Sequence, residues 1–352
     1  MTHLKFVPCL ADPDVWMRPA TKADGTEYYE YVLLYVDDAL CISNNAEHIL
    51  RNEIGKYFKL KEESIGPPKL YFGGHMRKVT LEDSTCAWAF SSSQYVQSAV
   101  KNVEKYIETR GWKLPRANTP ISQNYRPELD VSSELDKTDS SYYQSLIGIL
   151  RWMVELGRVD ICLEVSMMSS HLSLPRQGHL DQLLHIFAYL KKYHNTEMVF
   201  DPSEPKIDES LFERQDWSSS EFGDKLKEVT PDNMPPPRGM GFTVSAYVDA
   251  DHASDSVSRR SRTGFLVYLN NALVYWNSKK QTCIESSSFG SEFTARKQCT
   301  EYLRELRYKL RMMGIHVNGP SFVKGIINQF FVTPLSQTLP SRRNHKVLRT
   351  PL

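Results

Sequence analysis

The sequence predicts an α+β protein with more than one domain, and three features carry this prediction. Residues 28–43 hold two runs of β-branched and aromatic residues around an acidic pair, which is typical of a β-hairpin. Residues 143–190 repeat apolar side chains at spacings of three and four, as amphipathic helices do. Residues 242–313 alternate as strands and then continue as one long helical pattern. A chain of 352 residues is long enough for about two or three domains that each bury a core.

The composition indicates an intracellular protein without a membrane span. No apolar run approaches the roughly 20 residues that cross a bilayer, and the first residues lack the apolar core of a signal peptide. The six cysteines lie far apart and none has the spacing of a zinc site, which fits a reducing compartment. The formal charge of +1 hides an uneven distribution, because acids gather at 203–237 and bases at 338–352. We therefore expect a soluble protein of the cytoplasm, the nucleus or both.

The acidic pair Asp37 and Asp38 lies between the apolar runs 31–36 and 39–42, at the tip of the predicted hairpin. Adjacent carboxylates repel each other unless they are solvated or held by a cation, and hard oxygen ligands suit Mg²⁺. A divalent cation held there can bridge the phosphates of a nucleotide during phosphoryl transfer. The alternative is an ordinary turn, in which aspartate is common.

The run Tyr35-Val36-Asp37-Asp38 resembles the active-site tetrad of reverse transcriptases. Together with Ala11-Asp12-Pro13-Asp14 before it and Lys69-Leu70-Tyr71-Phe72-Gly73-Gly74 after it, the stretch resembles the copia-type retrotransposon Pol polyprotein, a product of transposable elements. The resemblance implies that Asp37 and Asp38 bind Mg²⁺ for RNA-directed DNA synthesis. It also implies a further metal-binding aspartate well upstream, and no acid before the hairpin has that context. We therefore expect an N-terminally truncated enzyme that lacks the fingers and the first catalytic strand.

Between the hairpin and residue 115, the sequence predicts a helix at 46–57, strands at 70–79 and 87–90, and a helix at 94–109 that closes at Gly111. The resemblance implies that residues 1–115 form a partial reverse-transcriptase palm and the start of the thumb.

A connector at 118–137 precedes three predicted helices, and the resemblance assigns residues 116–200 to the thumb and connection. Methionines within these helices are expected to fill the core rather than to form a cofactor site. His179 and His185 do not share a helix face, so we expect ordinary polar positions or neighbours of phosphate rather than a metal site.

An acidic, proline-containing stretch at 201–240 reads as a linker, after which a new domain is expected at 241–352. Strands are predicted at 242–251, 264–269 and 272–276, with Ser286, Ser287 or Ser288 as the N-cap of a helix at 293–313. This order resembles the first half of the ribonuclease H domain of copia-type elements. The fold implied is a partial palm and thumb/connection helices followed by a ribonuclease H-like α/β domain.

Within this domain, the resemblance implies that Asp249 and Glu292 are catalytic carboxylates that hold Mg²⁺ during cleavage of an RNA/DNA hybrid. Asp251 and Asp255 lie in the same loop and are alternatives to Asp249, or else solvated turn residues. In the run Gly325-Ile326-Ile327-Asn328-Gln329, isoleucine stands where the family has a third carboxylate and one residue is inserted, and a hydrocarbon cannot bind magnesium. The chain also ends before the family's final helix. Ribonuclease H activity is therefore expected to be weak or absent.

Basic residues of this domain are expected to contact nucleic acid, although charge runs can also be plain solvated faces. By resemblance they would surround the backbone of an RNA/DNA hybrid or template-primer, where neutralised phosphates give salt-dependent affinity. The candidates are Arg259, Arg260 and Arg262 after the first strand, Lys279 and Lys280 after the third, and Arg304 and Arg307 on the long helix.

The sequence thus predicts part of a copia-type reverse transcriptase/ribonuclease H that is catalytically impaired. Two alternatives stay open: a non-catalytic nucleic-acid-binding protein that keeps the basic surfaces, and a degenerate remnant without a selected function. The expected partners are nucleic acid and other Pol fragments, with no membrane.

Overall fold

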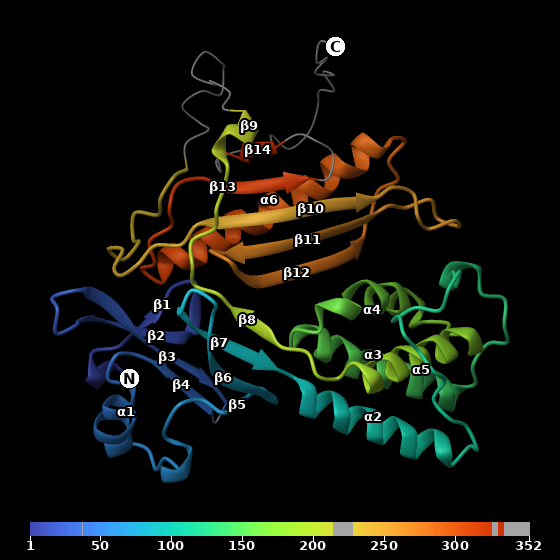
Figure 1. Cartoon of the computed structure of the whole chain (residues 1–352), viewed down its shortest axis with the longest axis horizontal. Coiled ribbons are helices and arrows are strands. Elements are labelled where there is room, and N and C mark those ends of the chain that lie inside the picture. Colours follow the sequence, from blue (N-terminus) through green and yellow to red (C-terminus); the bar gives the residue numbers. More distant parts are fainter. Residues whose placement is uncertain (37, 214–227, 326–329, 334–352) are drawn as a thin grey trace.

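The computed structural model describes residues 1–36, 38–213, 228–325 and 330–333, and within these it contains both helices and sheets, consistent with the predicted α+β class. Its strands form separate sheets, with a group of helices beside them and one long helix on the last sheet (Figure 1). In the described ranges the sheets have the orders β1-β2-β3-β4, β5-β6-β7-β8 and β12-β11-β10-β13-β14-β9. No helix in these ranges is long and apolar enough to cross a membrane.

The first sheet is an antiparallel meander that contains the predicted hairpin. Its strands are β1 (Val7–Cys9), β2 (Asp12–Thr21), β3 (Glu27–Tyr35) and β4 (Asp38–Ile42). Tyr35 pairs with Asp38, which confirms a tight turn between the two apolar runs. Val36 takes a positive φ of 54° in that turn, which is uncommon for a β-branched residue.

The helix expected at 46–57 forms as a chain of short turns rather than one regular helix. It consists of α1 (Ala46–His48), the π-helical turn η2 (Ile49–Glu53) and the 3₁₀ turn η3 (Ile54–Lys56). Ile49 and Ile54 are buried against Phe6 and Val32, as their spacing predicts. Phe58, which the same apolar spacing predicts to be buried, is instead 60% exposed.

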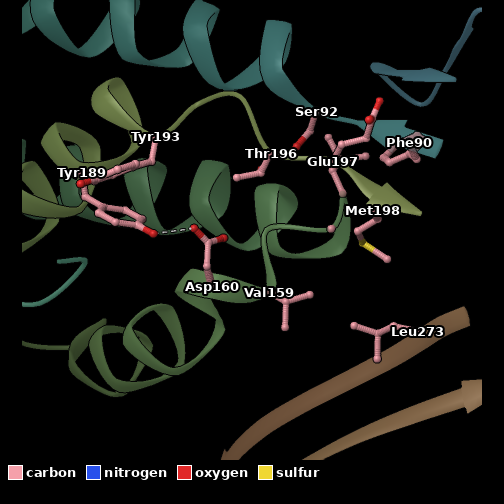
Figure 2. A pocket seen from close by; sticks show the side chains of 12 residues that line it. Phe90, Ser92, Val159, Asp160, Tyr189, Tyr193, Thr196, Glu197, Met198 and Leu273 are labelled. Carbon is pink, nitrogen blue, oxygen red and sulfur yellow. Dashed lines mark hydrogen bonds between the residues drawn. The ribbon is translucent and has the colours of Figure 1, made fainter. Parts of the chain in front are cut away.

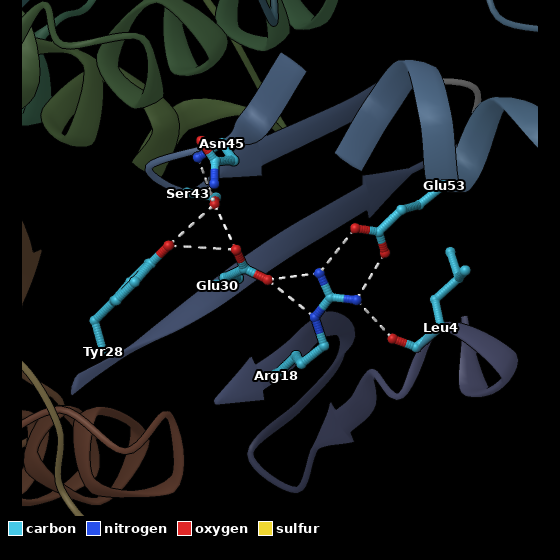
Figure 3. Close-up of polar contacts among 7 residues, drawn as sticks. All are labelled: Leu4, Arg18, Tyr28, Glu30, Ser43, Asn45 and Glu53. Carbon is cyan, nitrogen blue, oxygen red and sulfur yellow. Dashed lines mark hydrogen bonds and ion pairs between the residues drawn. The ribbon is translucent and has the colours of Figure 1, made fainter. Parts of the chain in front are cut away.

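An arginine at the centre of this region joins three segments (Figure 3). The Arg18 guanidinium donates from Nη2 to Glu30 at 2.6 Å, and from Nη1 to Glu53 at 2.7 Å and to the carbonyl of Leu4 at 2.8 Å. It also lies over the ring of Phe6, 4.3 Å from the ring centroid. Glu30 is only 6% exposed, so its charge is buried and compensated by Arg18. Glu30 therefore has a structural role.

The second sheet corrects one prediction. The stretch 70–79 is not a single strand but two, β5 (Leu70–Tyr71) and β6 (Gly74–Thr80), folded about Phe72 and Gly73. Both turn residues have positive φ, as a two-residue hairpin turn of type I′ requires. Strand β7 (Cys86–Ser91) confirms the prediction at 87–90, and β8 (Met198–Phe200) joins it from far along the chain.

The helix predicted at 94–109 and the three predicted after the connector all form, and they share one core. They are α2 (Ser93–Glu108), α3 (Lys137–Glu155), α4 (Cys162–Met168) and α5 (Gln177–Lys192). The core runs across residue 115, because Val100 and Val103 of α2 are buried with residues of α3 and α5. Met153 and Met168 are fully buried in it, as expected of core fillers. His179 is also buried; its ring bonds to Arg176 N at 3.0 Å and to the carbonyl of Pro127 at 2.9 Å, so it is a structural residue.

The third sheet carries the long helix α6 (Ser288–Met312) on one face. Its strands are β10 (Val244–Asp251), β11 (Arg262–Leu269), β12 (Ala272–Lys280), β13 (Ser321–Gly325), β14 (Phe330–Thr333) and the short β9 (Phe212–Glu213). The first three are antiparallel, with the predicted turn at Asn270 and Asn271, whereas β13 runs parallel to β10. The helix begins earlier than predicted, because Ser287 caps it by accepting from Gly290 N at 3.1 Å.

We predict that Arg18→Met lowers the free energy of unfolding by about 3 kcal/mol, because it leaves the buried carboxylate of Glu30 without its cation. Denaturant unfolding of the purified chain measures this change. Arg77→Met is the matched control, since the Arg77–Glu197 pair is surface-exposed and should contribute far less. Equal effects of the two substitutions would contradict the role given to Arg18.

Candidate functional site

The fold brings Asp249 and Glu292 together, although they are far apart in sequence. Asp249 is exposed near the end of β10, and Glu292 is buried in the second turn of α6. The amide of Ala250 donates to Glu292 Oε1 at 3.4 Å. Burial, and then the negative charge of Asp249, raise the pKa of Glu292. Because the charge of Asp249 acts on Glu292, and the next residue, Ala250, bonds to it, the two predicted residues share one site.

The second oxygen of Glu292 supplies a test of whether these residues fit a cation. Glu292 Oε2 is buried and has no hydrogen-bond partner within the described part of the chain. A buried, unpaired carboxylate oxygen beside a second carboxylate is unfavourable unless a proton or a cation lies between them. Because both donors are hard oxygens, the pair fits Mg²⁺.

Neighbouring polar side chains hold the start of α6 in place. Gln281 Nε2 donates to the carbonyl of Ser291 at 2.9 Å and to Thr263 Oγ1 at 3.1 Å. His252 Nδ1 lies 3.2 Å from Ser291 Oγ, which connects the loop after β10 to the same helical turn. Sequence reasoning missed Gln281, His252 and Ser291, since no spacing or motif marks them as members of one cluster.

Neither alternative to Asp249 completes a larger carboxylate cluster. Asp255 accepts from Lys280 Nζ and from Ser258 N. Burial by itself raises the pKa of Asp255, but the hydrogen bonds from Lys280 and Ser258 outweigh it and hold the pKa well below its usual range. Asp251 is exposed and pairs in register with Arg262. Among the residues that the structure describes, no group of three or more His, Cys, Asp or Glu side chains is placed to hold a metal ion.

The hairpin tip is described only in part. Asp37 lies outside the described residues, while Asp38 is the exposed first residue of β4. The ring of Tyr35 contacts Phe72 edge-on, with centroids 4.7 Å apart. Burial and the charge of Asp38 both raise the pKa of Tyr71. The hairpin turn between Tyr35 and Asp38 therefore lies beside the stretch that contains Tyr71 and Phe72.

The predicted nucleic-acid-binding residues of the sheet divide into two groups. Arg259, Arg260 and Lys279 are exposed. Arg262 is instead held against α4, where Nη1 donates to Ser166 Oγ at 2.7 Å, and burial lowers its pKa. Lys280 is paired with Asp255. Only the exposed group can reach a phosphate without breaking a contact within the protein.

Of the two predicted nucleic-acid-binding residues on α6, Arg307 is buried, which the prediction did not foresee. Arg307 is 4% exposed, with Nη2 bonded to Glu228 at 2.6 Å and Nη1 bonded to the carbonyl of Gly319 at 3.0 Å. Arg311 donates to the same Glu228 carboxylate at 2.7 Å. This corrects the expected contact between Arg307 and nucleic acid, because its buried guanidinium is committed to the protein. Arg304 is half-buried.

A separate cavity of about 390 Å³ lies between the helices, the second sheet and β12 (Figure 2). Its wall includes Leu156, Met198 and Leu273, and the carboxylate of Asp160 accepts from Tyr189 at 3.0 Å. None of the predicted site residues lines it.

Comparison with known proteins shows that the chain is similar to Pol polyproteins of transposons. The chain is 23% identical over 326 residues to the Retrovirus-related Pol polyprotein from transposon TNT 1-94 of Nicotiana tabacum, an alignment that covers 90% of the chain and 20% of the relative. It is 23% identical over 295 residues to the corresponding protein from transposon RE1 of Arabidopsis thaliana, covering 83% of the chain and 17% of the relative. The predicted resemblance to copia-type Pol polyproteins is confirmed.

The chain spans about a fifth of the length of these Pol relatives. It is also 22% identical to an uncharacterized mitochondrial protein of Arabidopsis thaliana, with 75% of the chain and 89% of that protein aligned. No protein-family model matches the chain, and no solved structure matches it.

The ion pairs of Glu228 predict a pH-dependent stability. Burial acts to raise the pKa of Glu228, but hydrogen bonds from Arg311 and Arg307 outweigh it and lower the pKa to about 2. The stabilisation is therefore complete above the ordinary glutamate pKa of about 4.3 and is lost as the pH falls toward 2. We expect Glu228→Gln to lower the free energy of unfolding by about 2 kcal/mol at pH 7 and by much less near pH 3.

Urea unfolding at both pH values tests this expectation. Glu305→Gln is the control, because Glu305 and Lys309, both on α6, form an ion pair that is exposed to solvent. If Glu228→Gln lowers the free energy of unfolding by the same amount at pH 7 and pH 3, the ion pairs do not cause the loss.

Proposed function

We propose that this chain is a copia-type reverse transcriptase/ribonuclease H relative that binds RNA/DNA hybrids and cleaves them weakly or not at all. The observation that carries the proposal is the pairing of Asp249 with Glu292. These are the residues that the ribonuclease H resemblance selects, and they come from two elements that only the fold brings together. The similarity to transposon Pol polyproteins over most of the chain supports the same origin.

The strand register supports one shared site for the carboxylates and the basic side chains. Asp249 pairs with Gly264, and two residues further along β10 Asp251 pairs with Arg262. Arg262 in turn pairs with Lys280. The carboxylate pair and the basic residues therefore meet at one end of β10, β11 and β12, where exposed Arg259, Arg260 and Lys279 would neutralise phosphates.

Asp249 and Glu292 would hold Mg²⁺ at this end of the sheet. A bound magnesium ion would supply charge stabilisation at a phosphate. The protein's own residues fix the geometry: the amide of Ala250 orients Glu292 Oε1, and Gln281 anchors the helical turn before it. Exposed Asp249 leaves the pair open to a phosphate from solvent.

Weak cleavage follows from the ligand set. Isoleucine, at 326–327 outside the described residues, stands where the resemblance implies a third carboxylate, and Asp255 is engaged by Lys280. Two carboxylates satisfy few of the roughly six positions of an octahedral Mg²⁺ ion. For RNA-directed DNA synthesis, the supporting features are the hairpin and exposed Asp38 at its tip, and primer extension on an RNA template is the assay for that activity.

We predict that Lys279→Ala and Arg259→Ala each weaken binding of a labelled RNA/DNA hybrid about severalfold and reduce the slope of log affinity against log salt by roughly one. Fluorescence anisotropy across a salt series gives both quantities. Lys61→Ala, at an exposed lysine far along the sequence from this sheet, should leave both unchanged. Hybrid affinity that does not respond to salt would contradict the proposed surface.

We further predict that any cleavage of a labelled hybrid in Mg²⁺ or Mn²⁺ falls by more than about 100-fold in Asp249→Asn and in Glu292→Gln, since each removes a ligand charge. Asp83→Asn, at an exposed turn, is the control. Fast wild-type cleavage would refute the claim of impairment, and cleavage that survives Asp249→Asn would refute the assigned site.

A further inference from the structure

Two large aromatic side chains on α6 remain outside the core. Phe289 is 71% exposed and Phe293 is 56% exposed. Their rings are nearly parallel, with centroids 6.4 Å apart and an interplanar angle of 22°. A planar group that stacks on one ring is therefore also close to parallel with the other. We call these two residues the aromatic pair.

The core does not need these rings. Helix α6 packs on the sheet through small or aliphatic side chains, including Ala295, Cys299 and Leu303, all fully buried. Single exposed apolar residues are normal on protein surfaces, but adjacent exposed aromatic rings more often mark a binding surface. The position of the aromatic pair on the helix indicates what it binds.

Helical spacing places the aromatic pair beside the carboxylates. Phe289, Glu292, Phe293 and Arg296 follow the spacing 0, 3, 4 and 7, so they share one side of α6. Glu292 belongs to the pair with Asp249. Exposed Lys279 and Arg259 lie at the end of the sheet where this carboxylate pair sits. Aromatic faces next to basic side chains are the combination by which proteins hold single-stranded nucleic acid.

We propose that Phe289 and Phe293 form a stacking platform for unpaired nucleobases beside the Asp249–Glu292 site. This inference rests on the proposed function, and it narrows the ligand to nucleic acid with a single-stranded segment, such as a hybrid with an overhang. The bases of an intact duplex are already stacked on one another, whereas unpaired bases expose the faces that the rings need. We favour nucleic acid over a second protein molecule, because exposed Lys279 and Arg259 lie at the end of the sheet that carries the neighbouring carboxylate pair.

The test compares three labelled probes by fluorescence anisotropy: a blunt RNA/DNA hybrid, the same hybrid with an oligothymidine overhang, and free oligothymidine. The full-length double variant Phe289→Ala/Phe293→Ala should bind the overhang hybrid and oligothymidine about tenfold more weakly, or more, and the blunt hybrid nearly as well as wild type. Phe289→Trp/Phe293→Trp should restore binding, because it keeps the ring faces. Tyr308→Ala, at an exposed aromatic residue on the same helix, is the matched control.

Several outcomes would overturn the platform. Unchanged affinity of the double alanine variant for oligothymidine is one, and an equal loss for all three probes is another. Conversion of a wild-type dimer to a monomer by the double variant would assign the rings to a protein interface instead. Failure of the wild type to bind the blunt hybrid, together with overhang-hybrid and oligothymidine binding that depends on the aromatic pair, would refute the proposed function while supporting the platform.

Discussion

The packing of β10 beneath α6 is the contact on which the candidate site depends. Val244, Ala246 and Val248 are buried against Ala295, Cys299 and Leu303, so the strand has one register relative to the helix. Because side chains alternate along a strand, a shift of one residue would expose the valines and turn Tyr247 and Asp249 toward the core. The apolar row thus fixes Asp249 beside Glu292, a carboxylate contact that is unfavourable by itself.

Hydrogen bonds in the surrounding structure hold Asp249 and Glu292 in this unfavourable contact. Gln281 and Ser287 hold the first turn of α6 through hydrogen bonds to backbone groups, and Ser166 of α4 contacts both Arg262 and the carbonyl of Ser278. These contacts join the helices to β12 and the sheet to the start of α6. Core packing thereby provides the stability that a charged, partly unsatisfied site lacks.

Packing also decides which basic residues pair with carboxylates inside the protein and which stay exposed. Arg307 and Arg311 converge on Glu228 and tie the chain after residue 227 to α6. Arg18 performs a similar task for Glu30 and Glu53 in the first sheet. Arg259, Arg260 and Lys279 stay exposed at the end of the sheet that carries Asp249. Residue type alone does not separate these roles, because an arginine pairs equally well with a carboxylate or a phosphate.

Local patterns in the sequence determined much of the fold. Short-range periodicity and turn residues predict the hairpin around Asp38, the helices α2 to α5 and the strands β10 to β12. The resemblance of short motifs selects Asp249 and Glu292. The tertiary structure alone decided the parallel addition of β13 to β10, the hairpin about Phe72, the burial of Arg307 and the exposure of Phe289. Periodicity identifies which side chains share a face, but burial depends on which distant segment covers that face.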